Sequence, residues 1–114
     1  MGVSYKEDIG DTRNSPTEIL FKKLKKNKAI VNVQDPIVEF WEELKIYVPK
    51  LYPKINLFDA IIFAVKHEEY RKINFNKWVN RRKMLIVDAN NVLSEKQHSI
   101  LAKKKYNVIS IGRG

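Results

Sequence analysis

The stretch that decides the fold is residues 2–16, which read GVSYKEDIGDTRNSP. It starts with a short apolar run that is typical of a strand end. It then crosses a polar loop in which Gly10 suits a tight turn. It ends at a helix start, because Ser15 is a good N-cap, Pro16 suits the first helical position and Glu18 completes a capping box. The pattern predicts a strand, a loop and a helix in succession.

A loop of this kind is a common place for ligands. In an open α/β sheet, ligands bind at the carboxyl ends of the strands. The amino terminus of a following helix favours anions. Lys6 and Arg13 add two cations to the same loop. The stretch therefore indicates an anion- or nucleotide-binding loop.

The rest of the chain alternates between helical and strand patterns. Apolar residues at helical spacing predict helices over about 16–27, 37–45, 75–81 and 94–104. Short apolar or β-branched runs predict strands over 29–33, 59–65, 84–87 and 108–111. Pro49 and Pro53 predict an irregular connection over 47–57. The alternation predicts a single α/β domain over residues 1–114 with a mainly parallel sheet.

Asp35 follows the predicted strand 29–33 and has two interpretations. An acidic residue at this point can bind a ribose in a dinucleotide-binding fold. That role needs a Gly-x-Gly-x-x-Gly turn after the first strand, and the sequence contains no such turn. We therefore expect Asp35, which precedes Pro36, to cap a turn.

The composition excludes several classes of site. The 114 residues include no cysteine, which excludes a disulfide, a thiolate metal site and a cysteine nucleophile, and we expect no metal site. No apolar run approaches the ~20 residues that span a bilayer. The amino terminus lacks a signal-peptide pattern. We therefore expect a cytoplasmic protein without membrane contact.

The formal net charge of +9 raises the question of nucleic-acid binding. The basic residues are spread over 22–28, 81–83 and 103–105, each at or after the end of a predicted helix, where cations suit the helix dipole. No known nucleic-acid motif accompanies them. We favour a solvated lysine-rich surface over nucleic-acid binding.

Further short motifs follow residues 2–16 in order, at 33–36 (VQDP), 59–62 (DAII), 67–70 (HEEY), 87–93 (VDANNVL) and 111–114 (IGRG). Together they resemble the C-terminal, UDP-binding domain of the UDP-glucose/GDP-mannose dehydrogenase family. The resemblance implies a Rossmann-like three-layer sandwich. Independently of the resemblance, the loops at 5–16, 66–70 and 88–91 follow the carboxyl ends of predicted strands, so we expect them to gather at one edge of the sheet.

The family oxidises the C6 hydroxyl of a nucleotide sugar to a carboxylate with two molecules of NAD in succession. Its NAD-binding domain and catalytic cysteine lie outside the resembling part. The resemblance therefore implies that this chain binds a UDP-sugar, carries no catalytic residue and binds no cofactor itself. It also implies an oxidoreductase parent that uses NAD, and an N-terminal NAD-binding domain as a partner. The identity of the sugar and of the base stays open.

The resemblance implies three substrate-binding residues, Tyr5, Lys6 and Asn90. Tyr5 matches an aromatic residue beside the sugar nucleotide, and the ammonium of Lys6 suits a diphosphate and hydroxyls. Asn90 stands where many members have an arginine that contacts the substrate. An asparagine side chain donates two hydrogen bonds but carries no charge. We therefore expect the affinity for the substrate, or the choice of sugar, to differ from that of members with an arginine at this position.

Arg13, His67 and Asp88 form a second group of candidates, and each has a structural alternative. Arg13 suits an ion pair that organises its loop. His67 lies at the crevice, where a histidine bonded to backbone is the alternative that we favour. Asp88 is expected to hold the loop that presents Asn90.

Family members have a full apolar strand before Gly2, and here only Met1 precedes it. The resemblance thus implies a truncated first strand, from a gene fragment or a shortened chain, and a homo-oligomer through the open sheet edge. Two alternatives to a UDP-sugar-binding domain remain. One is a small basic nucleic-acid-binding protein, and the other is a remnant fold that binds nothing.

Overall fold

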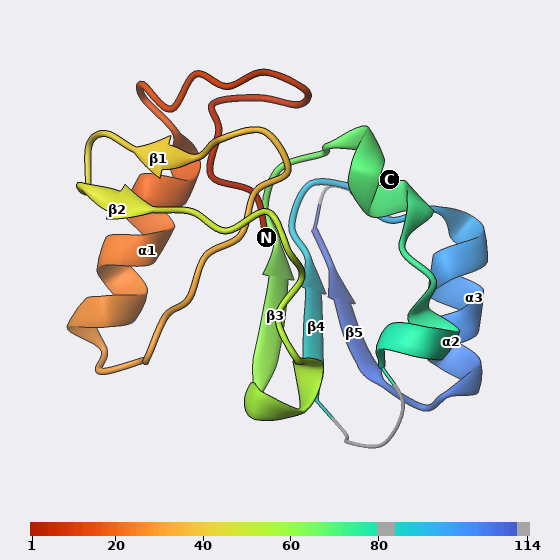
Figure 1. Ribbon diagram of the computed structural model, residues 1–114. Coiled ribbons are helices and arrows are strands. Elements are labelled where there is room, and N and C mark those ends of the chain that lie inside the picture. The colour runs from red at the N-terminus through yellow and green to blue at the C-terminus, as the bar shows by residue number, and fades with distance from the viewer. Residues whose placement is uncertain (80–83, 112–114) are drawn as a thin grey trace.

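The structure is a computed structural model that describes residues 1–79 and 84–111. Figure 1 shows a sheet with α1 (Pro16–Lys26) on one side and α2 (Phe75–Trp78) and α3 (Glu95–Lys103) on the other. The remaining elements are the 3₁₀ turns η1 (Ile55–Leu57) and η2 (Glu68–Lys72) and the strands β1 (Phe40–Trp41), β2 (Ile46–Tyr47), β3 (Ala60–Phe63), β4 (Leu85–Asp88) and β5 (Asn107–Ser110).

The sheet is parallel and has the strand order β3-β4-β5. Its register places Ile62 opposite Val87, and Val87 opposite Ile109. Helical segments connect the parallel strands, as parallel pairing requires. The predicted α/β fold class, a Rossmann-like arrangement with a parallel sheet, is confirmed.

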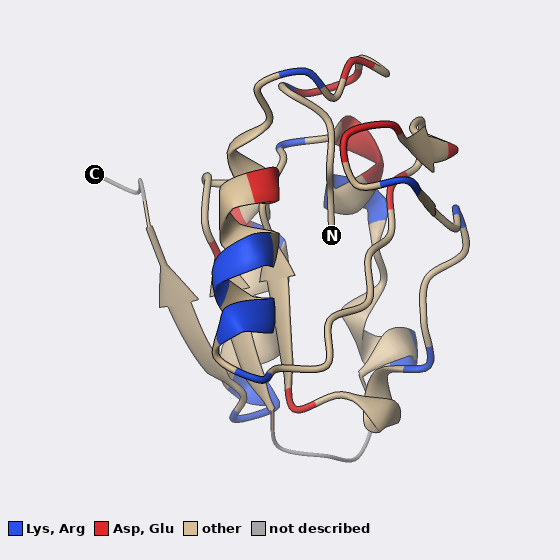
Figure 2. Cartoon of the chain, turned by 90° about the vertical axis from the view of Figure 1, so that its left-hand side faces the viewer, with Lys and Arg blue, Asp and Glu red and all other residues tan. Residues whose placement is uncertain are grey.

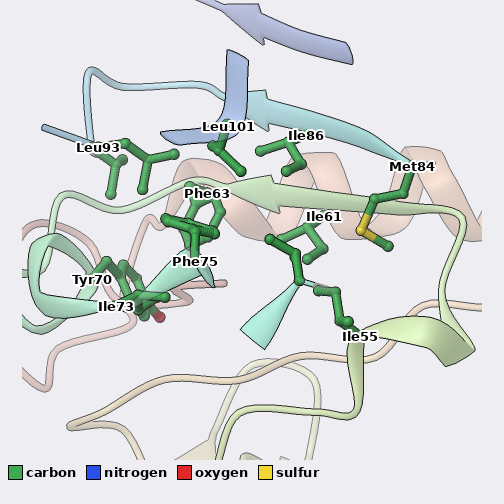
Figure 3. Packing of buried hydrophobic residues seen from close by; sticks show 12 residues of the cluster. Ile55, Ile61, Phe63, Tyr70, Ile73, Phe75, Met84, Ile86, Leu93 and Leu101 are labelled. Carbon is green, nitrogen blue, oxygen red and sulfur yellow. The ribbon is translucent and has the colours of Figure 1, made fainter. Parts of the chain in front are cut away.

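The main core lies between the sheet and the helices α2 and α3. Strand side chains alternate between faces, so Ile61 and Phe63 of β3 and Ile86 of β4 point to this side (Figure 3). Phe75 of α2 and Leu101 of α3 meet them and are fully buried. The rings of Phe63 and Phe75 pack edge to face, with centroids 6.0 Å apart. The unbroken apolar runs of the sequence thus form the centre of the molecule.

A second, smaller cluster joins residues 2–16 to the hairpin β1-β2. Val3, Val38, Trp41 and Val48 are buried together in it. The ring of Phe21 on α1 packs against Trp41 with centroids 5.6 Å apart. This cluster sets the path of the chain between Met1 and α1.

The start of α1 confirms part of what the sequence predicted for it. Ser15 is the N-cap and accepts a hydrogen bond from the Thr17 amide at 3.2 Å. The predicted capping box is wrong, because Glu18 pairs with Lys22 at 2.8 Å instead. The Ser15 hydroxyl also donates to the Ser4 carbonyl at 3.3 Å, which ties it to the preceding loop.

The predicted tight turn at Gly10 is also wrong. The left-handed residues of this loop are Asp8 (φ 60°) and Asn14 (φ 58°), residue types that tolerate this conformation. Gly2 is the glycine that the fold requires. Its φ is 95°, and a Cβ there would lie 2.6 Å from the Cβ of Val65.

Three predicted elements do not form. The strand end expected at residues 3–5 is not a strand, because the chain bends at residues 4–6 and the first assigned element is α1. Residues 37–45 are not a helix, because Asp35 holds a turn at Ile37 and Val38 and the chain then folds into the hairpin β1-β2. Residues 29–33 form no strand, although the chain there is drawn out without turns. A strand needs a neighbour to bond with, and the structure places no paired strand beside this segment.

Some predictions fall on residues that the structure does not describe, namely the basic cluster at 81–83 and most of the motif at 111–114. Within the described residues, no helix is both long enough and apolar enough to cross a membrane. Figure 2 shows lysines on the outer side of α1, consistent with a solvated surface.

Candidate functional site

The three predicted loops lie at the carboxyl edge of the sheet. β3 and β4 are parallel, so the loops that follow them leave at the same edge (Figure 1). The loop of residues 5–16 joins them there, because the Asp8 amide donates to His67 Nδ1 at 2.9 Å and the Glu68 amide donates to Asp8 Oδ1 at 3.1 Å. Arg71 donates to the Val92 carbonyl at 3.2 Å and so links the second loop to the third.

A fully buried histidine holds the first two loops together. His67 Nε2 lies 2.9 Å from Asp35 Oδ2 and 3.2 Å from Ser4 Oγ. Because the Asp8 amide donates to Nδ1, that nitrogen carries no proton and Nε2 carries one. His67 is therefore a neutral imidazole that donates to Asp35, with Ser4 as a second neighbour.

Asp35 fixes three segments of chain from its buried position. Its carboxylate accepts hydrogen bonds from the amides of Val3 (2.9 Å), Ile37 (2.8 Å) and Val38 (2.9 Å). The prediction that Asp35 caps a turn is confirmed. Burial raises its pKa, but the hydrogen bonds from His67 and these amides outweigh burial and leave the pKa lowered. Asp35 is thus held as a carboxylate.

The cluster of Ser4, His67 and Asp35 is not a catalytic triad. In a triad the serine and the carboxylate bond to different imidazole nitrogens. Here both lie at Nε2, and the Ser4 hydroxyl donates to the Lys6 carbonyl at 2.8 Å. The cluster is buried, so its role is to hold the backbone that carries Lys6.

Tyr5 and Lys6 emerge from this cluster with exposed side chains. The Tyr5 amide donates to the Asp11 carbonyl at 2.6 Å, which closes the loop. The Tyr5 side chain is 52% exposed, and Lys6 is exposed as well. The backbone of both residues is therefore fixed while their side chains face solvent, an arrangement suited to binding a ligand from outside.

Asp88 builds the third loop. Its carboxylate accepts hydrogen bonds from the amides of Val92 (2.6 Å) and Leu93 (3.0 Å) and lies 3.1 Å from His98 Nε2. Asp88 is fully buried, whereas Asn90 is exposed on the loop that these bonds hold. The sharing of one crevice by Lys6 and Asn90 stays a prediction.

Arg13 forms a forked ion pair with Asp11. Its Nε lies 3.1 Å from Oδ1 and its Nη2 lies 2.8 Å from Oδ2. The hydrogen bonds from Arg13 lower the pKa of Asp11 to about 2. Both groups are exposed, so the pair organises the loop and leaves the guanidinium open to solvent.

The sequence did not indicate Ser4 or Asp8 as partners of His67. Their contacts join positions about 60 residues apart, and no local pattern encodes such a contact. The short motifs named in the sequence analysis are the signal that could have indicated contacts of His67. Asp35 meets His67, and the hydroxyl of Tyr70 donates to Gln34 Oε1 at 2.8 Å, so the motif at 33–36 binds the motif at 67–70.

In the described part of the chain, no group of acidic or histidine side chains suits a metal ion.

Comparison with known proteins gives a family match over most of the chain. The sequence model described as "UDP-glucose/GDP-mannose dehydrogenase family, UDP binding domain" matches residues 1–95. These residues include every loop of the site described above.

Several known proteins are similar to this chain. A UDP-N-acetyl-D-mannosamine dehydrogenase of Methanococcus aeolicus is 26% identical over 119 residues, which cover 99% of this chain and 25% of that protein. A protein of the same name from Pyrococcus horikoshii is 27% identical, covering 83% of this chain and 22% of its own length. A UDP-N-acetyl-D-glucosamine 6-dehydrogenase of Salmonella typhi is 28% identical, with coverage of 88% and 24%. The chain thus spans about a quarter of the length of these relatives.

Proposed function

Because the chain belongs to the UDP-glucose/GDP-mannose dehydrogenase family as its UDP binding domain, we propose that it binds a UDP-sugar at the carboxyl edge of the sheet. The observation that carries the proposal is the buried cluster of Ser4, His67 and Asp35. It fixes the loop of Tyr5 and Lys6 against the end of β3 and leaves both side chains exposed.

The chemistry of the edge suits a nucleoside diphosphate. Lys6 supplies an ammonium for the diphosphate, and Tyr5 supplies a ring that packs against the nucleoside or the sugar. Asn90, on the loop held by Asp88, donates hydrogen bonds to uncharged oxygens of the ligand. The relatives named above act on UDP-N-acetylhexosamines, so these sugars are the first probes to use.

Calorimetry with UDP and the two UDP-N-acetylhexosamines tests the proposal. Lys6→Ala should weaken binding by about 1.5–3 kcal/mol, the range for a lost hydrogen bond to a charged group, because the diphosphate loses its cation. Lys25→Ala is the matched control, since Lys25 is an exposed lysine on the far part of α1. An unaltered dissociation constant in folded Lys6→Ala protein removes Lys6 from the site.

The same titrations separate the two alternatives. The lysines coloured along α1 in Figure 2 are the feature that favours nucleic acid. Binding to mixed-sequence DNA with a steep salt dependence, and no heat from UDP, would support a nucleic-acid-binding protein. No heat from either ligand would support a fold that binds nothing.

A further inference from the structure

Arg71 links the loop of residues 66–70 to the loop of residues 88–93 from a partly buried position. It lies on η2, which Figure 1 shows in green beyond the carboxyl ends of β3 and β4. Its Nη1 donates to the Val92 carbonyl at 3.2 Å. None of the ion pairs among the described residues includes Arg71. In that part of the chain, the guanidinium therefore serves a backbone carbonyl rather than a carboxylate.

The backbone of η2 is held on both sides of Arg71. Gln97 Nε2 donates to the Tyr70 carbonyl at 2.8 Å and to the Ile73 carbonyl at 3.1 Å. Tyr70 and Gln97 are both buried, so water does not compete for these bonds. Arg71 thus reaches the Val92 carbonyl from a fixed base. Its hydrogen bond constrains the loop of residues 88–93 because the base itself does not move.

One peptide unit of that loop is held from two sides. The unit between Val92 and Leu93 contains the Val92 carbonyl and the Leu93 amide, which point in opposite directions in a trans peptide. Arg71 binds the carbonyl, and Asp88 Oδ2 accepts from the amide at 3.0 Å. A guanidinium is always charged, so its bond to the carbonyl is of the stronger, charge-assisted kind. The orientation of this peptide unit is therefore fixed.

The fixed peptide unit after Val92 sets the position of Asn90. Asn90 and Asn91 precede this unit, and both are exposed. Asn91 has φ 50°, a left-handed conformation that the surrounding structure has to maintain. The start of the loop is tied to the sheet, because the Ala89 amide donates to the Phe63 carbonyl at 3.0 Å. With both ends of the loop held, the backbone of Asn90 has one defined position.

η2 also holds the loop that carries Lys6. The Glu68 amide at the start of η2 donates to Asp8 Oδ1 at 3.1 Å. One end of η2 therefore holds the loop of Lys6, and Arg71 near the other end holds the loop of residues 88–93. This single turn sets the spacing between the two loops.

We propose that Arg71 is a positioning residue for the UDP-sugar site. Through the Val92 carbonyl, Arg71 fixes the loop that presents Asn90 to the ligand. The proposal rests on the proposed function, in which Lys6 binds the diphosphate and Asn90 binds uncharged oxygens of the ligand. Arg71 then governs the part of the affinity that depends on Asn90.

Amide exchange of the free protein tests the contact without ligand. Arg71→Met removes every donor but keeps an unbranched side chain, and it should speed exchange at the Leu93 amide by about tenfold relative to the Ile86 amide. The Asp8 amide, beside the other end of η2, should keep its rate. Lys72→Met is the matched control, because Lys72 is the exposed neighbour with the same charge. Equal exchange at Leu93 in the two variants would overturn the proposal.

Calorimetry with UDP-N-acetylglucosamine tests the action through Asn90. Arg71→Met should weaken binding by about tenfold, within the range for coupled neighbours. In an Asn90→Ala background, the same change should have no further effect. Lys72→Met should leave the dissociation constant unchanged in both backgrounds. Arg71→Lys keeps a cationic donor for the single carbonyl bond and should restore most of the affinity.

The outcomes of the titrations separate this role from its alternatives. A full effect of Arg71→Met in the Asn90→Ala background would overturn the proposal and show that Arg71 contacts the ligand itself. An unchanged dissociation constant in Arg71→Met or in Asn90→Ala would overturn it too. In these cases the parent protein still binds the UDP-sugar, so the proposed function stands. No heat from the parent protein would overturn both, and the exchange data would then report only whether Arg71 holds the loop.

Discussion

Asp35 ties together the start of the chain, the turn at residues 37–38 and the loop at His67. Asp35→Asn keeps the size of the side chain but removes the charge and one acceptor oxygen. We expect the free energy of unfolding to fall by about 1.5–3 kcal/mol, the range for hydrogen bonds to charged groups. Urea unfolding measures the change. Glu7→Gln is the control, because Glu7 is exposed and its substitution should alter stability little.

The same residue should contribute to acid unfolding. The folded pKa of Asp35 is lowered, so below pH 4 the unfolded chain binds a proton that the folded chain does not. The stabilisation from Asp35 is present above that pH and is lost as pH falls through the folded pKa. Asp35→Asn should therefore show a shallower loss of stability in acid than the parent. An identical acid profile of the two proteins would contradict this role.

Met1 should make stability depend on pH near neutrality. Burial lowers the pKa of its ammonium from 8.0 to about 6, against the attraction of Asp35. Between these values the unfolded chain binds more protons at the amino terminus, so the free energy of unfolding rises with pH. At about 1.4 kcal/mol per pKa unit, the shift corresponds to about 3 kcal/mol.

Urea unfolding at pH 6, 7 and 8 measures the effect of Met1. The chain acetylated at Met1 is the matched control, because its amino terminus does not titrate. For each protein, the free energy of unfolding is plotted against pH. The difference between the two slopes reports Met1 alone, because the histidines contribute equally to both proteins. Equal slopes would show that the ammonium is solvated in the folded chain.

At the scale of single residues, the sequence predicted roles that depend on near neighbours. Asp35 caps a turn and Ser15 caps α1, and both patterns are local. The partners of His67 were not predictable, because Ser4 and Asp8 come from a loop on another part of the chain. Whether Tyr5, Lys6 and Asn90 bind a ligand remains a prediction.

Among the elements, the buried runs were predicted best. β3 lies within the predicted strand 59–65, and β4 overlaps the predicted strand 84–87. These predictions succeeded because a long apolar run has few alternatives to burial in a parallel sheet. Residues 37–45 were predicted as a helix from the spacing of Phe40, Trp41 and Leu44. They form a hairpin with Lys45 at φ 55°, and the ring of Phe40 lies 4.9 Å from that of Tyr47. Contacts of Trp41 with Val3 and Phe21, which are distant in the sequence, decided between the two patterns.

The segment 29–33 has strand composition but lacks a strand to pair with. We expect the amides of residues 30–33 to exchange quickly, because a backbone without ladder bonds opens at little cost. The amide of Ile86 in the central strand β4 should exchange slowest, since it is fully buried and has a strand on each side. Amide exchange followed by NMR measures both groups. Slow exchange at residues 30–33 would contradict this prediction.

For the whole molecule, we predict UDP-sugar binding without dehydrogenase activity by the 114-residue chain. The sequence has no cysteine and no Gly-x-Gly-x-x-Gly turn, so it offers neither the family's nucleophile nor a dinucleotide-binding turn. The site holds a buried neutral histidine, and the exposed Lys6 suits binding rather than hydride transfer. Formation of NADH, followed by absorbance with UDP-N-acetylmannosamine and UDP-N-acetylglucosamine, tests this. Sustained NAD reduction by the purified chain would contradict the prediction. Activity that appears only after addition of an NAD-binding fragment from a relative would support a division of the reaction between two polypeptides.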